Sequence, residues 1–123
     1  MKGRLECMKK MPILFVGHGS PMNAIEDNQY TRAWRDIAKR IPKPKVILSI
    51  SAHWYTDGTR IMNGENPKTI HDMYGFPKEL YEVQYNTAGA PNIASIARSL
   101  ISRETRYDNS WGIDHGTWSV LTH

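Results

Sequence analysis

Short apolar runs alternate with amphipathic stretches along this chain, which predicts strands alternating with helices. Two runs, at 13–16 and 46–50, have the length of buried strands. Between them, apolar residues recur at helical spacing over 30–41, and two prolines then follow. When a helix joins two parallel strands of one sheet, the connection is right-handed in nearly all known folds. The sequence therefore predicts two neighbouring parallel strands joined by a helix.

The same alternation continues to the end of the chain. Residues 59–63 and 104–107 predict two further short strands, and residues 81–85 alternate as a half-buried strand does. Pro91 opens an apolar stripe that predicts a helix over 91–101. We expect an α/β fold with a mostly parallel central sheet and flanking helices. Because the last apolar pattern stops at residue 123 without a cap, we also expect a truncated domain.

The length and composition fit one globular domain. A chain of 123 residues can bury a core, and its 40% hydrophobic and 23% charged residues are ordinary for soluble proteins. Residues 1–10 carry several charges and precede the first apolar run. We interpret them as a loose N-terminal extension, which leaves residues 11–123 to form the fold.

Charge and cysteine content limit the classes of partner. The net charge is +4, but the basic residues are scattered, so we expect no nucleic-acid partner. No segment approaches the ~18 apolar residues of a transmembrane helix, and the first apolar run is too short for a secretion signal. The single cysteine, Cys7, cannot form an internal disulfide. A reducing compartment, the cytoplasm, is therefore expected.

The first two apolar runs each end on a histidine. His18 lies between two glycines after the first run, and His53 follows the second run. If the runs are adjacent parallel strands about 4.8 Å apart, both imidazoles leave the same edge, where open α/β sheets bind ligands. Both could then reach one metal ion with bonds of ~2.1 Å. The sequence predicts that His18 and His53 bind a metal, against the alternatives of a tight turn and a core histidine.

Two further histidines are candidates for chemistry. His71 and Asp72 lie in a long loop, where they could line a substrate entrance, orient a metal ligand or simply organise a turn. His115 lies where a helix begins, so it could exchange protons, complete the metal site or be an ordinary helix start. A catalytic zinc usually takes three protein ligands, and non-haem iron(II) takes two histidines and a carboxylate.

Other catalytic patterns are absent from the sequence. It contains no Gly-x-Ser-x-Gly elbow, no His-Glu-x-x-His metalloprotease motif and no Cys-x-x-Cys pair. A reaction centred on a metal is the chemistry that this comparison leaves.

Four ordered motifs carry a resemblance to a known family. They are Gly-His-Gly-Ser-Pro at 17–21, Ser-Ala-His-Trp at 51–54, His-Asp-Met-Tyr-Gly-Phe-Pro at 71–77 and Trp-Gly-Ile-Asp-His-Gly-Thr-Trp at 111–118. The chain resembles the N-terminal half of the 4,5-DOPA extradiol dioxygenase family, within the LigB-type ring-cleaving dioxygenases. The resemblance implies an α/β fold and cleavage of a catechol such as DOPA by dioxygen. It also implies a non-haem iron(II) centre, with zinc as the alternative metal.

The resemblance assigns a role to each candidate residue. His18 and His53 look like metal ligands, His115 looks like a catalytic histidine, and His71 with Phe76 looks like part of the substrate pocket. Residues 11–123 then form the N-terminal half of one dioxygenase domain, and the remaining ligands belong to the other half. A half-sheet with open edges is expected to pair with another copy, which implies a homo-oligomer.

Two other functions stay open on the sequence alone. One is a zinc-dependent hydrolase on a similar sheet, which would activate water in place of dioxygen. The other is a non-catalytic interaction module that retains the fold.

Overall fold

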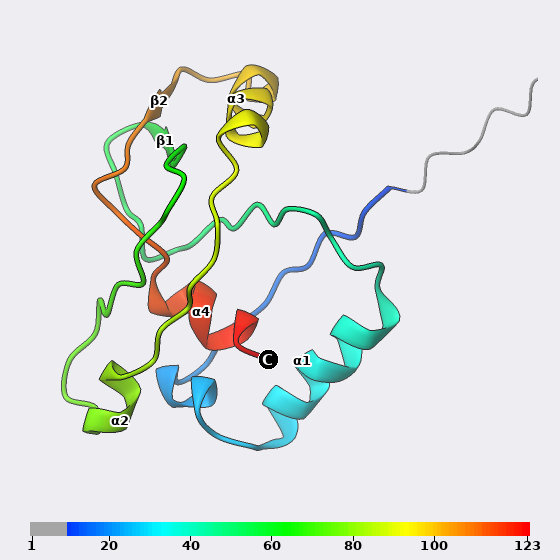
Figure 1. Ribbon diagram of the computed structural model, residues 1–123, viewed down its shortest axis with the longest axis vertical. Coiled ribbons are helices and arrows are strands. Elements are labelled where there is room, and N and C mark those ends of the chain that lie inside the picture. Colours follow the sequence, from blue (N-terminus) through cyan, green and yellow to red (C-terminus); the bar gives the residue numbers. More distant parts are fainter. Residues whose placement is uncertain (1–9) are drawn as a thin grey trace, which may run out of the picture.

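The computed structural model describes residues 10–123, which form an α/β arrangement of short elements joined by long loops (Figure 1). The predicted fold class is confirmed. The predicted extension at 1–10 lies outside the described residues, apart from Lys10. Within the described part of the chain, no helix combines the length and the apolar character needed to cross a membrane. The elements, in chain order, are η1 (Pro21–Ala24), α1 (Gln29–Arg40), β1 (Thr59–Ile61), α2 (Lys78–Tyr81), α3 (Pro91–Leu100), β2 (Thr105–Tyr107) and α4 (His115–Leu121).

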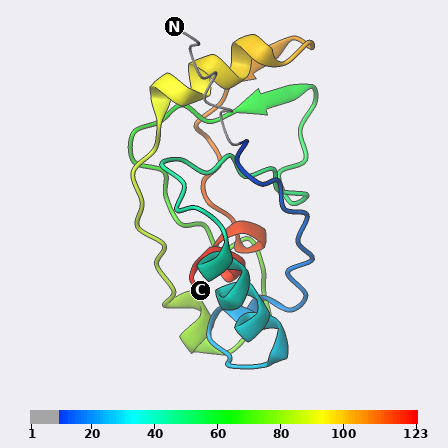
Figure 2. The ribbon, with the colours of Figure 1, turned by 90° about the vertical axis from the view of Figure 1, so that its right-hand side faces the viewer.

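The sheet consists of β1 and β2, which pair in parallel. Thr59 lies opposite Thr105 and Ile61 lies opposite Tyr107, so the strands predicted at 59–63 and 104–107 are confirmed. Helix α3 connects to β2 and lies with both strands at one end of the molecule, while α1, α2 and α4 lie at the other (Figures 1 and 2).

The predicted strands at 13–16 and 46–50 are wrong. Both segments run without regular secondary structure, and their apolar side chains face solvent. The exposed fraction is 97% at Ile13, 105% at Phe15 and 91% at Ile50. A strand exists only where a neighbouring backbone supplies ladder partners, and no described residue supplies them here.

The strand predicted at 81–85 is also wrong. Its first residue ends α2, and the remainder lies beside the side chain of Thr69. The Tyr85 N–H donates to Thr69 Oγ1 at 2.8 Å, and this hydroxyl donates to the Tyr85 carbonyl at 3.2 Å. A hydroxyl therefore satisfies both backbone groups that a neighbouring strand would otherwise engage.

Helix α1 forms where its capping residues predict it. The Asn28 side chain accepts hydrogen bonds from the N–H groups of Tyr30 and Thr31, and Thr31 Oγ1 accepts from the Asn28 N–H. This reciprocal capping box satisfies donors that the first helical turn leaves free. The helix ends at Arg40, just before Pro42, because proline cannot continue the hydrogen-bond ladder.

The core at the helical end of the molecule forms around α4. Trp118 on α4 and Leu80 on α2 are fully buried, and α4 packs against η1. Trp118 also donates its indole Nε1–H to the Ile70 carbonyl at 2.9 Å. The indole thus contributes buried apolar area while its polar group stays satisfied.

A short parallel bridge brings the loop at 68–72 against the start of α4. The Ile70 N–H donates to the Ile113 carbonyl at 2.9 Å, and the Ile113 N–H donates to the Lys68 carbonyl at 2.7 Å. Gly112 lies so close to the Lys68 carbonyl that no side chain fits there. The bridge therefore depends on glycine at this position, and it delivers Asp72 to the start of the helix.

The exposed apolar segments predict self-association of the 123-residue chain. Apolar area of this kind leaves water when two molecules meet, so we expect oligomers in sedimentation velocity at micromolar concentration. Replacing Phe15 and Ile50 by serine should shift the distribution towards monomer, whereas Tyr74→Ser, at an exposed loop position, should not. A single monomeric species for the unmodified chain would contradict this prediction.

Candidate metal centre

Three histidines converge beside the start of α4. His18 precedes η1, His53 follows the segment at 46–50, and His115 is the first residue of α4. One ring nitrogen from each lies within 4.8 Å of the other two. The Nε2 atoms of His18 and His53 are 2.8 Å apart. These two histidines therefore lie side by side although the runs that precede them form no sheet.

The ring spacing distinguishes the three pairs. For two imidazoles on one ion with bonds of about 2.1 Å, the ring centres lie roughly 4.5–5.3 Å apart. The centres of His18 and His53 are 5.0 Å apart, and those of His18 and His115 are 5.1 Å apart. His53 and His115 are only 4.0 Å apart at an interplanar angle of 40°. The spacing of His18 to either neighbour therefore suits a shared ion, whereas the tilted rings of His53 and His115 lie too close together for one.

A carboxylate fixes the orientation of His115. Asp72 Oδ1 accepts hydrogen bonds at 2.9 Å from both the backbone N–H and the ring Nδ1 of His115. Burial raises the pKa of Asp72, but these hydrogen bonds from His115 outweigh it, and the pKa lies below its ordinary value. The ionised carboxylate accepts the Nδ1 proton, which selects the tautomer whose Nε2 can act as an acceptor.

Two asparagines fix the backbone at His18. Asn23, which is buried, donates its side-chain amide to the His18 carbonyl at 2.9 Å. Asn28 in turn donates to Asn23 Oδ1 at 2.7 Å. Gly19, at φ 65°, adopts the left-handed conformation that turns the chain into η1.

The surroundings of His18 favour the neutral imidazole, which is the form that binds a metal. Burial lowers the pKa of His18, the nearby His115 and His53 lower it further, and Asp114 partly opposes them. Its Nδ1 is buried without a hydrogen-bond partner among the described residues. Three convergent imidazole nitrogens are donors that suit zinc or iron(II). The donor set therefore fits a divalent transition metal.

His71 and Phe76 lie apart from the three-histidine cluster. His71 Nε2 donates to the Val83 carbonyl at 2.9 Å, and its ring centre is 5.6 Å from that of Trp118. The Phe76 N–H donates to the Tyr81 hydroxyl at 3.4 Å. These contacts stabilise the loop between the cluster and α2. The substrate role of both residues stays a prediction.

Sequence reasoning missed Asn23 and Asp114, and anticipated Asp72 only as a possible orienting group. Asp72 and Asp114 each adjoin a histidine in the sequence, and that adjacency was the available signal. Asn23 carried no comparable signal, because its amide acts on a backbone carbonyl five residues away.

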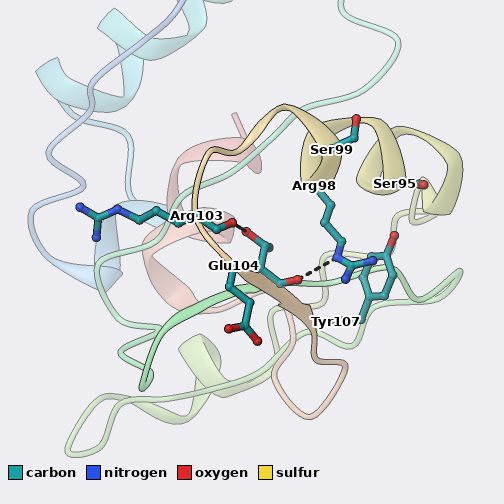
Figure 3. A pocket seen from close by; sticks show the side chains of 7 residues that line it. Ser95, Arg98, Ser99, Arg103, Glu104 and Tyr107 are labelled. Carbon is teal, nitrogen blue, oxygen red and sulfur yellow. Dashed lines mark hydrogen bonds between the residues drawn. The ribbon is translucent and has the colours of Figure 1, made fainter.

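A separate cavity of about 360 Å³ lies between α3 and β2 (Figure 3). Arg98 Nε donates to the Thr105 carbonyl at 2.7 Å, and its guanidinium lies 4.7 Å from the centre of the Tyr107 ring. None of the three clustered histidines lines this cavity. Arg98 therefore ties the helix to the strand at the opposite end of the molecule from α4.

Comparisons with known proteins place the cluster in a family context. Residues 10–122 match the family model described as the catalytic LigB subunit of aromatic ring-opening dioxygenase. The 4,5-DOPA dioxygenase extradiol of Escherichia coli K12 is 46% identical over 91% of this chain and 42% of its own length. The protein of the same name from Beta vulgaris is 37% identical over 87% of this chain and 42% of its own length.

A fungal relative shows the same partial coverage. The dioxygenase tasH of Hapsidospora irregularis is 32% identical over 90% of this chain and 39% of its own length. The chain thus spans about two fifths of the length of these relatives. The match to the family model covers nearly all of the chain, including the three histidines of the cluster. The chain belongs to the LigB family of aromatic ring-opening dioxygenases.

Proposed function

We propose that the protein acts in extradiol cleavage of a catechol-type molecule such as DOPA, with dioxygen as co-substrate at a non-haem metal centre. The observation that carries the proposal is the convergence of His18, His53 and His115 in a chain of the LigB family. Relatives named 4,5-DOPA dioxygenase extradiol support the substrate class. Iron(II) is the proposed metal, with zinc as the alternative.

His18 and His53 are the proposed ligands from this chain. Their Nε2 atoms already face each other, and a spacing of 2.8 Å is that of a hydrogen bond. Two nitrogens that bind one ion at about 2.1 Å stand slightly farther apart than this, so a small separation of the rings would admit the ion. When bound, the metal would hold the catechol oxygens and dioxygen together and mediate electron transfer between them.

His115 is the proposed proton-transfer residue. Its Nε2 lone pair faces the cluster, while Asp72 holds the proton on Nδ1. A proton accepted at Nε2 from a catechol hydroxyl would create an imidazolium, which the adjacent carboxylate stabilises. Its burial, with an exposed fraction of 7%, strengthens that interaction because little water screens it.

The remaining parts of the proposal rest on sequence. The motif at 71–77 supports a substrate pocket that includes His71 and Phe76, outside the metal ligands. The single cysteine supports a reducing compartment, and we propose the cytoplasm. The exposed apolar segments support a homo-oligomer.

Ring cleavage is tested by loading the native protein with iron(II) anaerobically and then adding a catechol and oxygen. We expect a yellow ring-opened product, with one molecule of oxygen consumed for each molecule of product. Hydrolysis of an ester or amide at the same rate with and without oxygen would contradict the proposal and favour a zinc hydrolase.

Metal content and turnover should separate the roles of the three histidines. We expect His18→Ala and His53→Ala to lose at least about 10-fold in metal affinity, because each removes a direct ligand. His115→Gln should retain the metal and lose roughly 10²–10⁴-fold in turnover.

Elemental analysis after dialysis and a single-turnover assay are the measurements, and His71→Ala is the control that retains metal. Loss of metal in His115→Gln to the same degree as in His18→Ala would contradict the division of roles.

Acid should destabilise the metal-free protein through His18. Its folded pKa lies below the ordinary value of 6.5, so the unfolded chain binds this proton first as the pH falls. The free energy of unfolding should therefore decline from about pH 6.5 downwards, and urea titrations with a chelator present measure it. His18→Gln should make the decline shallower above pH 3.8. Below that pH the stabilising contribution of Asp72 is lost as well, because the pKa of this carboxyl in the folded protein lies below 3.8. Equal slopes in both proteins would contradict this assignment.

A further inference from the structure

The segment that carries His53 is held against α4 by side chains. Ser49 Oγ lies 2.8 Å from Thr117 Oγ1, and Ser51 Oγ donates to Asp114 Oδ1 at 2.8 Å. The side chains of both serines contact residues at the start of α4, and His53 follows Ser51 by two residues. We call the contacts of Ser49 and Ser51 with Thr117 and Asp114 the polar seam.

Ser51 links the polar seam directly to His53. Its hydroxyl donates to Asp114 and accepts a hydrogen bond from the His53 N–H at 3.2 Å. The hydroxyl therefore fixes the backbone of the residue that presents the imidazole. No other hydrogen bond to the His53 backbone occurs among the described residues.

Asp114 is held in place by hydrogen bonds to both oxygens of its carboxylate. Its exposed fraction is 1%, and its second oxygen accepts the Trp111 Nε1–H at 2.9 Å. Although Asp114 is the N-cap residue of α4, its side chain makes no cap hydrogen bond. A buried carboxylate is costly unless it is hydrogen-bonded, so both contacts are needed to keep it in place.

Gly116 provides the space that the His53 ring occupies. A Cβ atom at residue 116 would lie 2.6 Å from His53 Cδ2 and 3.2 Å from Asp114 Oδ1. Any larger residue would displace the imidazole from this position. The ring is therefore held through Ser51 and seated against the backbone of α4.

We propose that Asp114 is a positioning residue that fixes His53 through Ser51 and thereby sets the geometry of the metal centre. The inference rests on the proposed function for the metal itself. It goes beyond that function by assigning a role to a carboxylate that neither binds the metal nor contacts the His115 ring nitrogens in the described structure. The segment at 46–50 has no β-ladder, so the seam supplies the register that a ladder would otherwise give.

The test compares Ser51→Ala, which removes the hydroxyl that links Asp114 to His53, with Ser51→Thr, which keeps a hydroxyl at this position. Cobalt(II) is the probe, because its visible absorption reports the number and geometry of its ligands. We expect Ser51→Ala to bind cobalt 10–100-fold more weakly with altered absorption bands. Ser51→Thr should recover both properties. Gly116→Ala should also alter the cobalt absorption bands, because the added methyl group would contact the His53 ring directly.

Two controls separate positioning from folding. Ser110→Ala removes an exposed hydroxyl that donates to Asp108, so it should leave cobalt affinity and absorption unchanged. Circular dichroism of each variant should match the parent, whereas Ser51→Ala and Gly116→Ala should melt at a lower temperature, because one removes a partner of the buried Asp114 and the other crowds the His53 ring. A folded Ser51→Ala protein with the parent's cobalt affinity and spectrum would overturn the proposal.

A metal-free measurement makes the inference independent of cobalt binding. We expect Ser51→Ala to shift the ring nitrogen resonances of His53 in NMR spectra, because the ring moves relative to His18. Unchanged resonances would overturn the positioning role. If Ser51→Ala shifts these resonances but the parent binds no cobalt, the positioning role is supported and the proposed metal function is contradicted.

Discussion

The contact between Asp72 and His115 is the constraint on which the site depends. One carboxylate oxygen accepts the first N–H of α4 and the ring proton of its first residue. Because the helix's own N-cap side chain makes no such bond, a residue 43 positions earlier performs the capping. The bridge from Lys68 to Ile113 delivers that residue. A change in this contact would therefore alter the start of α4, the path of the loop at 68–72 and the orientation of the His115 ring together.

Each histidine of the cluster is held by a hydrogen bond to a different residue outside the cluster. Asn23 holds the His18 carbonyl, Ser51 holds the His53 N–H, and Asp72 holds both nitrogen donors of His115. The contacts act on backbone or on the distal ring nitrogen, so the nitrogens that face the cluster stay available. At the proposed metal site, ligands ordered in this way would lower the cost of binding an ion.

The elements that the sequence predicts correctly are those with local signals. Helix α1 has its cap at Asn28, α3 has its proline at the first position, and both paired strands were located. The runs at 13–16 and 46–50 failed because an apolar pattern reports a preference for burial and says nothing about which backbone lies alongside. The approach of His18 to His53 was expected from two parallel strands that do not form, so the histidines meet although the reasoning that led to them was wrong. The buried amide of Asn23 depends on a tertiary contact with no pattern in sequence.

Asn28 belongs to two structures at once, since it caps α1 and donates to the asparagine behind His18. Fraying of the first turn of α1 would release that donor and loosen the loop that presents the imidazole. Thermodynamic linkage would then work in the opposite direction as well: an ion bound at the proposed centre would restrain the helix start. Amide hydrogen exchange at the beginning of α1 should thus sense events at a cluster that the helix never touches.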